Sequence, residues 1–168
     1  GTGSTDIEII NTSFSGNQAL NGASVLALDN IASCQLYNSI LWNNPGTDIL
    51  DLNVGSETIE HCLIQGGYAN GTAILDLDPQ FIAPFQGTAP NMSGDFHIGN
   101  NSPGIDQGNN VFLGGLVEDY LGETRVCGAN VDLGACEYQD PFCGLIIFVN
   151  QSATNGANNG SSWANAYV

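Results

Sequence analysis

Carboxylates are the side chains in this sequence that could carry out most of its chemistry, because 17 Asp and Glu residues accompany a single basic residue, Arg125. Asp76 and Asp78 lie two positions apart, so on an extended strand both carboxylates would point to the same face. Two carboxylates about 5 to 10 Å apart are what a glycoside hydrolase requires. The pair Asp78-Pro79 is also typical of the start of a turn, which is the structural interpretation of the same residues.

Calcium is the cofactor that the composition favours, although no cofactor is specified by a motif. Hard cations take carboxylate and carbonyl oxygens, and many acidic residues here lie near Gly and Asn in expected turns. Neither an EF-hand nor a nonapeptide calcium motif is present. We therefore select Asp76, Asp78 and Asp132 as the candidate Ca²⁺ ligands from composition alone.

The remaining reactive side chains have structural interpretations. His61 and His97 have no cysteine or carboxylate at metal-ligand spacing, and no Gly-x-Ser-x-Gly motif indicates a serine nucleophile. Five cysteines are an odd number, so at least one thiol stays free or pairs outside the chain. Cys34 and Cys62 are expected in the core. A disulfide is expected among three cysteines that lie close together, provided that the protein is extracellular: Cys127, Cys136 and Cys143.

The formal net charge of −16 excludes several classes of partner. Nucleic acid and anionic membrane surfaces both require a basic patch, which a chain with one basic residue lacks. No run of 18 apolar residues occurs, so no membrane span is expected. Only 11% of residues are charged, which leaves the surface to Asn, Gln, Ser, Thr and Gly and is common in secreted β-solenoids. No signal peptide is evident, so export would depend on sequence outside this chain.

A short sequence repeat predicts the strands and bends that position these side chains. Residues 9–17 (Ile-Ile-Asn-Thr-Ser-Phe-Ser-Gly-Asn) align without gaps over residues 36–44 (Leu-Tyr-Asn-Ser-Ile-Leu-Trp-Asn-Asn), and more loosely over residues 59–67 (Ile-Glu-His-Cys-Leu-Ile-Gln-Gly-Gly). Offsets of about 27 and about 23 residues are typical of stacked repeats. The repeat predicts a ladder with two apolar columns and a column of bend residues: Ile9, Leu36 and Ile59; Phe14, Leu41 and Ile64; Asn11, Asn38 and His61.

Asn tolerates the left-handed backbone of a tight bend better than other non-glycine residues, so each repeat is expected to form a strand, a bend and a strand. Stacked in register, such repeats make a parallel β-helix. We predict an all-β protein with β-helix coils in residues 1–67, an irregular cap over the last coil in residues 68–143, and a linking strand in residues 144–168. Residues 119–125, which include Arg125, are expected to form a surface turn.

An ordered set of motifs then carries a resemblance to a known family: Asn38-Ser-Ile-Leu-Trp-Asn-Asn44, Asp76-Leu-Asp-Pro-Gln-Phe81, Gly94-Asp-Phe-His-Ile98, Ser102-Pro-Gly-Ile-Asp-Gln-Gly108, Arg125 and Val131-Asp-Leu-Gly-Ala-Cys-Glu137. Residues 7–138 resemble the C-terminal part of bacterial right-handed parallel β-helix surface proteins of the pectate-lyase-like superfamily, the choice-of-anchor Q type. The resemblance implies a secreted or cell-surface, adhesin-like protein, with surface polysaccharide as a further candidate partner. Because the superfamily also includes lyases and hydrolases, a carbohydrate-active enzyme is the alternative, and Arg125 would be the base available to a lyase.

The last segment departs from this pattern, because residues 150–168 resemble the opening of such a domain rather than its end. The expected terminal strand comprises Leu145, Ile146, Ile147, Phe148 and Val149, with Trp163 in the segment beyond it. We hypothesise that these residues cover the open end of an adjacent repeat or another copy of the chain, so that modules stack head to tail into a fibre. The simpler alternative is that residues 144–168 fold back onto their own module.

Overall fold

The structure, a computed structural model, describes residues 6–20, 23–29, 33–53, 56–144 and 147–150, together with residues 152, 156, 157, 159, 161–165 and 167. This described part is all-β, as the sequence predicts. It contains ten strands, and its helical elements are two 3₁₀ helices, η1 (Asn110–Leu113) and η2 (Trp163–Asn165). In the same residues, no helix is long and apolar enough to cross a bilayer.

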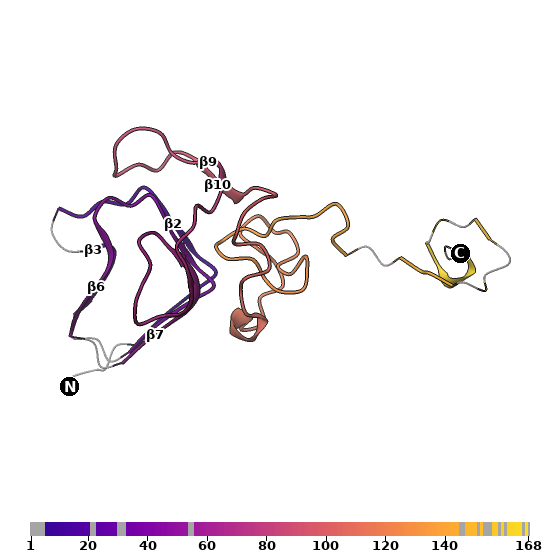
Figure 1. The fold of residues 1–168 in the computed structure, drawn as a ribbon, viewed down its shortest axis with the longest axis horizontal. Coiled ribbons are helices and arrows are strands. Elements are labelled where there is room, and N and C mark those ends of the chain that lie inside the picture. Colours follow the sequence, from indigo (N-terminus) through magenta and orange to yellow (C-terminus); the bar gives the residue numbers. More distant parts are fainter. Residues whose placement is uncertain are drawn as a thin grey trace.

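The largest sheet is parallel, curls into a half-barrel and stacks three repeats (Figure 1). Repeat 1 comprises β1 (Asp6–Ile10) and β2 (Ser13–Phe14), repeat 2 comprises β4 (Ser33–Tyr37) and β5 (Ile40–Leu41), and repeat 3 is β7 (Ser56–Ile64). The strand order is β1-β4-β7-β5-β2, and β8 (Thr72–Leu75) pairs with β7. The register stacks equivalent residues of the three repeats: Ile9, Leu36 and Ile59 in one column, and Phe14, Leu41 and Ile64 in another.

A left-handed residue sets this geometry, and it lies between the two strands in repeats 1 and 2 and within β7 in repeat 3. Asn11 and Asn38 have φ of 50°, and His61 has φ of 52°. Asn and His are among the few non-glycine residues that populate this region readily, so the three positions keep the residue types that the bend requires. The bend turns the chain, and the side chains before and after it can therefore pack into different parts of the core.

The first core lies between the main sheet and a second, two-stranded parallel sheet (Figure 1). The second sheet is formed by β3 (Ala23–Asp29), which follows repeat 1, and β6 (Thr47–Asn53), which follows repeat 2. Leu28 and Ile49 from these strands pack against the buried ladder residues of repeats 2 and 3: Leu36, Leu41, Ile59 and Ile64. Burying each of these side chains contributes roughly 1.5 to 3 kcal/mol, so this core holds the stack together.

A second core forms on the opposite face of the main sheet, because successive side chains of a strand point to opposite faces. Ile40 and Leu63 pack there against Leu133 and against the antiparallel pair of β9 (Phe81–Ala83) and β10 (Asp95–Ile98). Residues 99–143 complete this face, and apart from η1 they form turns and loops. Their contacts reach repeats 1 to 3 from the side: Ser13 accepts a hydrogen bond from Ala135, Phe112 stacks on Tyr37, and His61 contacts Gln107. The segment expected to cap the last repeat therefore lies along the bends.

Residues 99–143 have little regular secondary structure, and hydrogen bonds from buried side chains fix their backbone instead. Arg125 is only 1% exposed, and its Nη2 donates to the carbonyls of Asp132 (3.0 Å) and Gly134 (2.7 Å). The expectation of a surface turn was therefore wrong for Arg125. Glu137 accepts from the backbone N–H groups of Cys127 (2.8 Å) and Asp132 (3.0 Å). These hydrogen bonds satisfy groups that would be costly to bury unpaired.

The end of the chain forms a small unit away from the main body (Figure 1). Val149 and Tyr167 make a parallel bridge, Asn150 donates its N–H to the Tyr167 carbonyl at 2.9 Å, and the Phe148 and Trp163 rings lie 4.9 Å apart. A parallel bridge between residues 18 positions apart means that the chain returns alongside itself in the same direction. We call the described residues between 147 and 167 the terminal unit.

Two alanine substitutions in one ladder column test how the core is distributed. Leu36 is fully buried, whereas Ile9 in the same column is only partly buried. We expect Leu36→Ala to lower the free energy of unfolding by about 2 to 5 kcal/mol, and Ile9→Ala by less than half as much. Urea unfolding of dilute protein followed by circular dichroism measures both values, and an equal loss at the two positions would contradict this core.

Candidate functional site

The candidate site is the open end of the stack at repeat 1. In the described part of the chain, β1 pairs with β4 and β2 pairs with β5, and no strand pairs with their other edges. Leu36 and Leu41 are buried, but Ile9 and Phe14 of repeat 1 are only half-buried. Repeat 1 therefore presents both an apolar end and a strand edge, the features through which β-sheets accept further strands.

A column of polar residues beside the bend makes hydrogen bonds that run in one direction from repeat to repeat. Thr12, Ser39 and Cys62 occupy equivalent positions, and each donates to the carbonyl two residues before it. Ser39 Oγ also accepts the N–H of Thr12 at 3.2 Å, from the repeat before it. Burial raises the pKa of the Cys62 thiol to about 12, and a hydrogen bond with the Ser39 backbone opposes that rise. Within the described residues no backbone N–H donates to Thr12 Oγ1, so the column stops unfilled at repeat 1.

Two side chains that end in an amide accept hydrogen bonds in the same direction along the stack. They belong to Asn44, which follows β5 of repeat 2, and to Gln65, which follows β7 of repeat 3. Asn44 Oδ1 accepts the N–H of Asn17 at 2.9 Å, and its Nδ2 donates to the Phe14 carbonyl at 3.0 Å. Gln65 Oε1 accepts the N–H of Asn43 at 2.8 Å. For both backbone N–H donors, Asn17 and Asn43, the accepting side chain lies one repeat later than the donor. Asn17 Oδ1 accepts no such N–H in the described part of the chain, which again leaves repeat 1 open.

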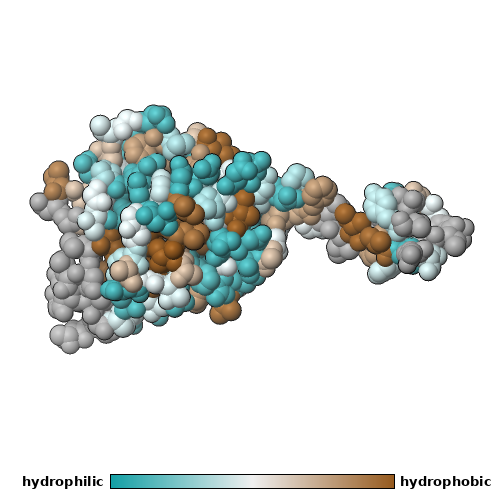
Figure 2. All heavy atoms as spheres, viewed as in Figure 1, coloured by the Kyte–Doolittle hydropathy of each residue, from teal (hydrophilic) through white to brown (hydrophobic). Residues whose placement is uncertain are grey.

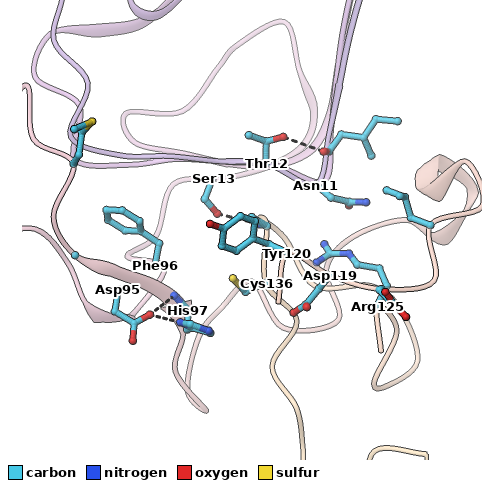
Figure 3. Close-up of a pocket in the computed structure, with 16 residues that line it drawn as sticks. Asn11, Thr12, Ser13, Asp95, Phe96, His97, Asp119, Tyr120, Arg125 and Cys136 are labelled. Atoms are coloured by element: carbon cyan, nitrogen blue, oxygen red, sulfur yellow. Dashed lines mark hydrogen bonds and ion pairs between the residues drawn. The ribbon is translucent and has the colours of Figure 1, made fainter. Parts of the chain in front are cut away.

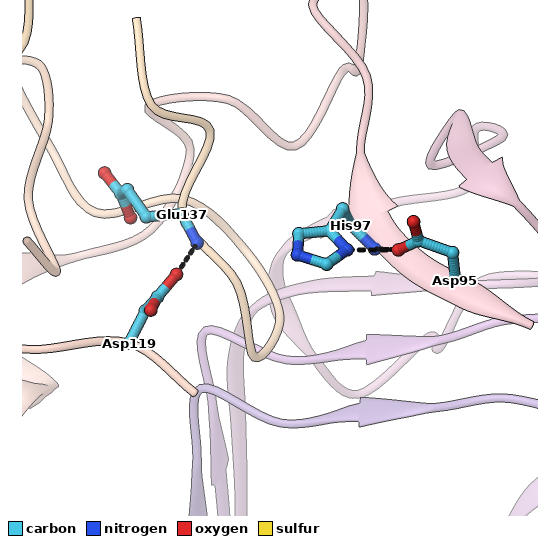
Figure 4. Close-up of polar contacts among 4 residues, drawn as sticks. All are labelled: Asp95, His97, Asp119 and Glu137. Carbon is cyan, nitrogen blue, oxygen red and sulfur yellow. Dashed lines mark hydrogen bonds and ion pairs between the residues drawn. The ribbon is translucent and has the colours of Figure 1, made fainter. Parts of the chain in front are cut away.

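A cavity of about 860 Å³ lies beside this open end, between the bend of repeat 1, β10 and residues 116–125 (Figure 3). Its wall includes Asp95, His97 and Cys136, which are the residue types of a cysteine nucleophile with its base. His97 Nδ1 contacts the Asp95 carboxylate, and this partner lowers the pKa of Asp95 (Figure 4). Burial raises the pKa of Cys136 to about 11, so the thiol stays protonated at neutral pH, and no hydrogen bond joins it to His97. The cavity therefore lacks an activated nucleophile at Cys136.

The candidate calcium ligands are not brought together. Asp76 and Asp78 follow β8 rather than lie within a strand, and they accept the N–H groups of Gly66 and Gln80 respectively. Asp132 is buried among residues 99–143, where it accepts from Asp106 and Tyr138 at 2.7 Å each. In the part of the chain that the structure describes, no group of three or more His, Cys, Asp or Glu side chains could hold a metal ion. Each of the three carboxylates accepts a backbone N–H, and calcium binding by them stays a prediction.

The other sequence-predicted residues are placed as follows. Cys127 and Cys143 form a disulfide, while Cys34, Cys62 and Cys136 are free and buried. Leu145 and Ile146 lie outside the described residues. Ile147 and Val149 are exposed, and Phe148 packs on Trp163 within the terminal unit.

Sequence reasoning missed Arg125 as a buried residue and missed the hydrogen-bonding roles of Asp119 and Glu137. Asp119 Oδ1 accepts from Leu121 and Glu123, and its Oδ2 accepts from Glu137 (Figure 4). One signal was available for Arg125, because it is the single basic residue in a chain of charge −16. No comparable signal marks the carboxylates, because their partners are backbone groups far along the chain.

Stability is expected to fall as the pH rises, because burial raises the pKa of Glu137 from its ordinary value of 4.5 to about 7. A raised pKa in the folded state means that the folded protein binds the proton more tightly than the unfolded chain. The contribution is therefore complete below about pH 4.5 and is lost as the pH rises through 7. Glu137 alone should account for about 3 kcal/mol of this loss, measured by urea unfolding between pH 4.5 and 8.

Glu137→Gln should flatten the dependence, since the amide cannot ionise. Glu118→Gln is the matched control, because Glu118 is exposed, and it should keep the wild-type slope. The account of this residue fails if Glu137→Gln retains the slope of the wild-type protein.

Comparisons with protein-family models, curated proteins and solved structures find no match to this chain. The resemblance to β-helix surface proteins therefore rests on the sequence motifs alone.

Proposed function

We propose that this chain is a structural, adhesive module of a right-handed parallel β-helix protein of the choice-of-anchor Q type, secreted or displayed on a bacterial surface. A second copy of the chain, or an adjacent repeat of the same protein, covers repeat 1, so that modules stack head to tail into a fibre. One observation carries this proposal: the directional hydrogen-bond columns continue from repeat 3 to repeat 1 and end there, because no N–H of the described residues donates to Thr12 Oγ1 or Asn17 Oδ1.

The terminal unit supplies the covering element. It stands away from the body, and it already contains one parallel turn of chain, bridged at Val149 and Tyr167 (Figure 1). Its residues Ile147 and Val149 are exposed apolar side chains on an extended segment. Placed on repeat 1, such a turn would bury Ile9 and Phe14 and provide backbone N–H groups for the open columns. Because the two contacting surfaces differ, the contact is heterologous and continues from copy to copy.

Export is supported by two further features. The Cys127–Cys143 disulfide links two loops of a segment with little regular secondary structure, and such bridges persist in oxidising surroundings. The surface seen in Figure 2 mixes polar and apolar residues, and only 11% of the chain is charged. Both features suit a protein that works outside the cell.

A carbohydrate-active enzyme is the alternative, and the cavity beside repeat 1 is the place where it would act. Of the three carboxylates on its wall, Asp119 accepts three backbone hydrogen bonds and Asp95 contacts His97, which leaves only Glu118. Two carboxylates free to act as acid and base are what a hydrolase needs. Arg125, the base required by a lyase, is buried and donates to backbone carbonyls. These contacts favour the structural module.

Self-association tests the proposed stacking. At a formal charge of −16 the copies repel one another, so association should strengthen when salt screens that repulsion. We expect sedimentation velocity to show larger species as protein concentration rises, more so at about 0.5 M than at about 0.02 M salt. Negative-stain micrographs should show linear stacks. Compact monomers at every concentration and salt level would refute the proposal.

A pair of substitutions locates the contact. Val149→Asp places a charge on the terminal unit and should abolish the larger species. Phe142→Asp is the matched control, because Phe142 is an exposed apolar residue that lies before the terminal unit, and it should leave association unchanged.

A further inference from the structure

The side chains of the bend residues point outward and hold the backbone of the segment that runs along them. His61 Nδ1 contacts the Gln107 carbonyl at 3.0 Å. Asn38 binds a single residue through both ends of its amide: Oδ1 accepts the Asn109 N–H at 2.8 Å, and Nδ2 donates to the Asn109 carbonyl at 3.1 Å. Repeats 3 and 2 therefore each hold an extended backbone through the same position of the bend.

Asn11 occupies that position in repeat 1, with the same left-handed φ of 50° as Asn38, but its amide has no partner. Both Oδ1 and Nδ2 are shielded from water and lack a hydrogen bond within the described part of the chain. After Asn109 the chain enters η1, so it leaves the line of bends before it reaches Asn11. A buried polar group without a partner costs roughly 1 to 3 kcal/mol, and such groups usually have a partner in the functional state.

Arg125 is the second unsatisfied group on the wall of the same cavity. Its Nε and Nη1 have no partner among the described residues, although the side chain is almost completely buried. Nη2 of the same guanidinium binds two backbone carbonyls. Asp119, Asp132 and Glu137 already stabilise its positive charge, so the free donors suit a neutral acceptor such as a carbonyl better than another anion. Figure 3 shows the Asn11 and Arg125 side chains in the cavity.

We propose that this cavity binds an extended backbone segment of a second copy, residues 147–150 of its terminal unit. The Asn11 amide takes the N–H and carbonyl of one residue of that segment, as Asn38 does with Asn109, and Arg125 donates to a further carbonyl. Met92, Leu116 and Tyr120 at the cavity rim are exposed and accommodate the apolar side chains of the incoming segment. This inference rests on the proposed stacking and assigns the residues that fix its register.

Matched glycine substitutions test the assignment. Glycine keeps the left-handed backbone without strain and removes only the side chain, so Asn11→Gly and Asn38→Gly differ in what the amide binds. Asn38→Gly should lower the Tm of the dilute protein by about 4 to 8 °C, because two hydrogen bonds inside the molecule are lost. Asn11→Gly should not lower that Tm, because it removes an amide that has no partner in the dilute protein. It should nevertheless raise the dissociation constant for self-association, measured by sedimentation, at least tenfold.

Each outcome is decisive. Association of Asn11→Gly that equals the wild type overturns this inference and leaves the stacking itself intact. A fall in Tm for Asn11→Gly as large as that for Asn38→Gly also overturns it, because the Asn11 side chain would then stabilise the isolated molecule. Absence of association in the wild-type chain overturns both the inference and the proposed stacking. If Asn11→Gly does not fold, Asn11→Asp, which tolerates the same backbone and removes the Nδ2 donor, is measured in the same way.

Discussion

Asn11, Asn38 and His61 adopt the same left-handed backbone at the same place in three successive repeats, and the remaining architecture follows from that bend. Because the bend comes at a fixed point between two strands, the strands of successive repeats meet in parallel and in register. Residues on either side of it divide between two cores, one facing the sheet of β3 and β6 and one facing the hairpin of β9 and β10. The outward side chain of the bend then anchors residues 107–109.

The hydrogen bonds between repeats have a direction, and this direction determines which end of the stack is open. A side chain of the later repeat accepts a backbone N–H of the earlier one, as Ser39 does from Thr12 and Asn44 does from Asn17. The last repeat can be covered by the chain that follows it, here β8. Within the described residues, the equivalent acceptors of the first repeat, Thr12 Oγ1 and Asn17 Oδ1, receive no such N–H. An exposed strand edge beside an apolar end favours the addition of another strand. A covering element at repeat 1 would pair the strand edge and bury the apolar side chains at the same time.

The sequence predicted the strands, the bends and the apolar columns because an aligned stretch of nine residues recurs three times and so fixes which residues pair between repeats. It did not predict the arrangement of residues 99–143. Their hydrogen bonds join residues far apart in the chain, such as Asn38 with Asn109, and their side chains bind backbone groups, which leave no trace in residue identity. Asp132 illustrates the difficulty: near a turn it resembles a calcium ligand or a local turn former, yet it is buried and binds Asp106 and Tyr138. Arg125 was expected on the surface because a charged side chain is usually exposed.

Hydrogen–deuterium exchange of the strand amides at low and high protein concentration tests the open first repeat most directly. If a second copy covers repeat 1, those amides of residues 6–14 that do not bond to repeat 2 exchange rapidly in dilute protein and become protected as concentration rises. Residues 33–41, which form repeat 2 between repeats 1 and 3, are protected throughout. Amides of that set in residues 6–14 that are already as protected as residues 33–41 in dilute protein, or that show no change with concentration, would contradict the account.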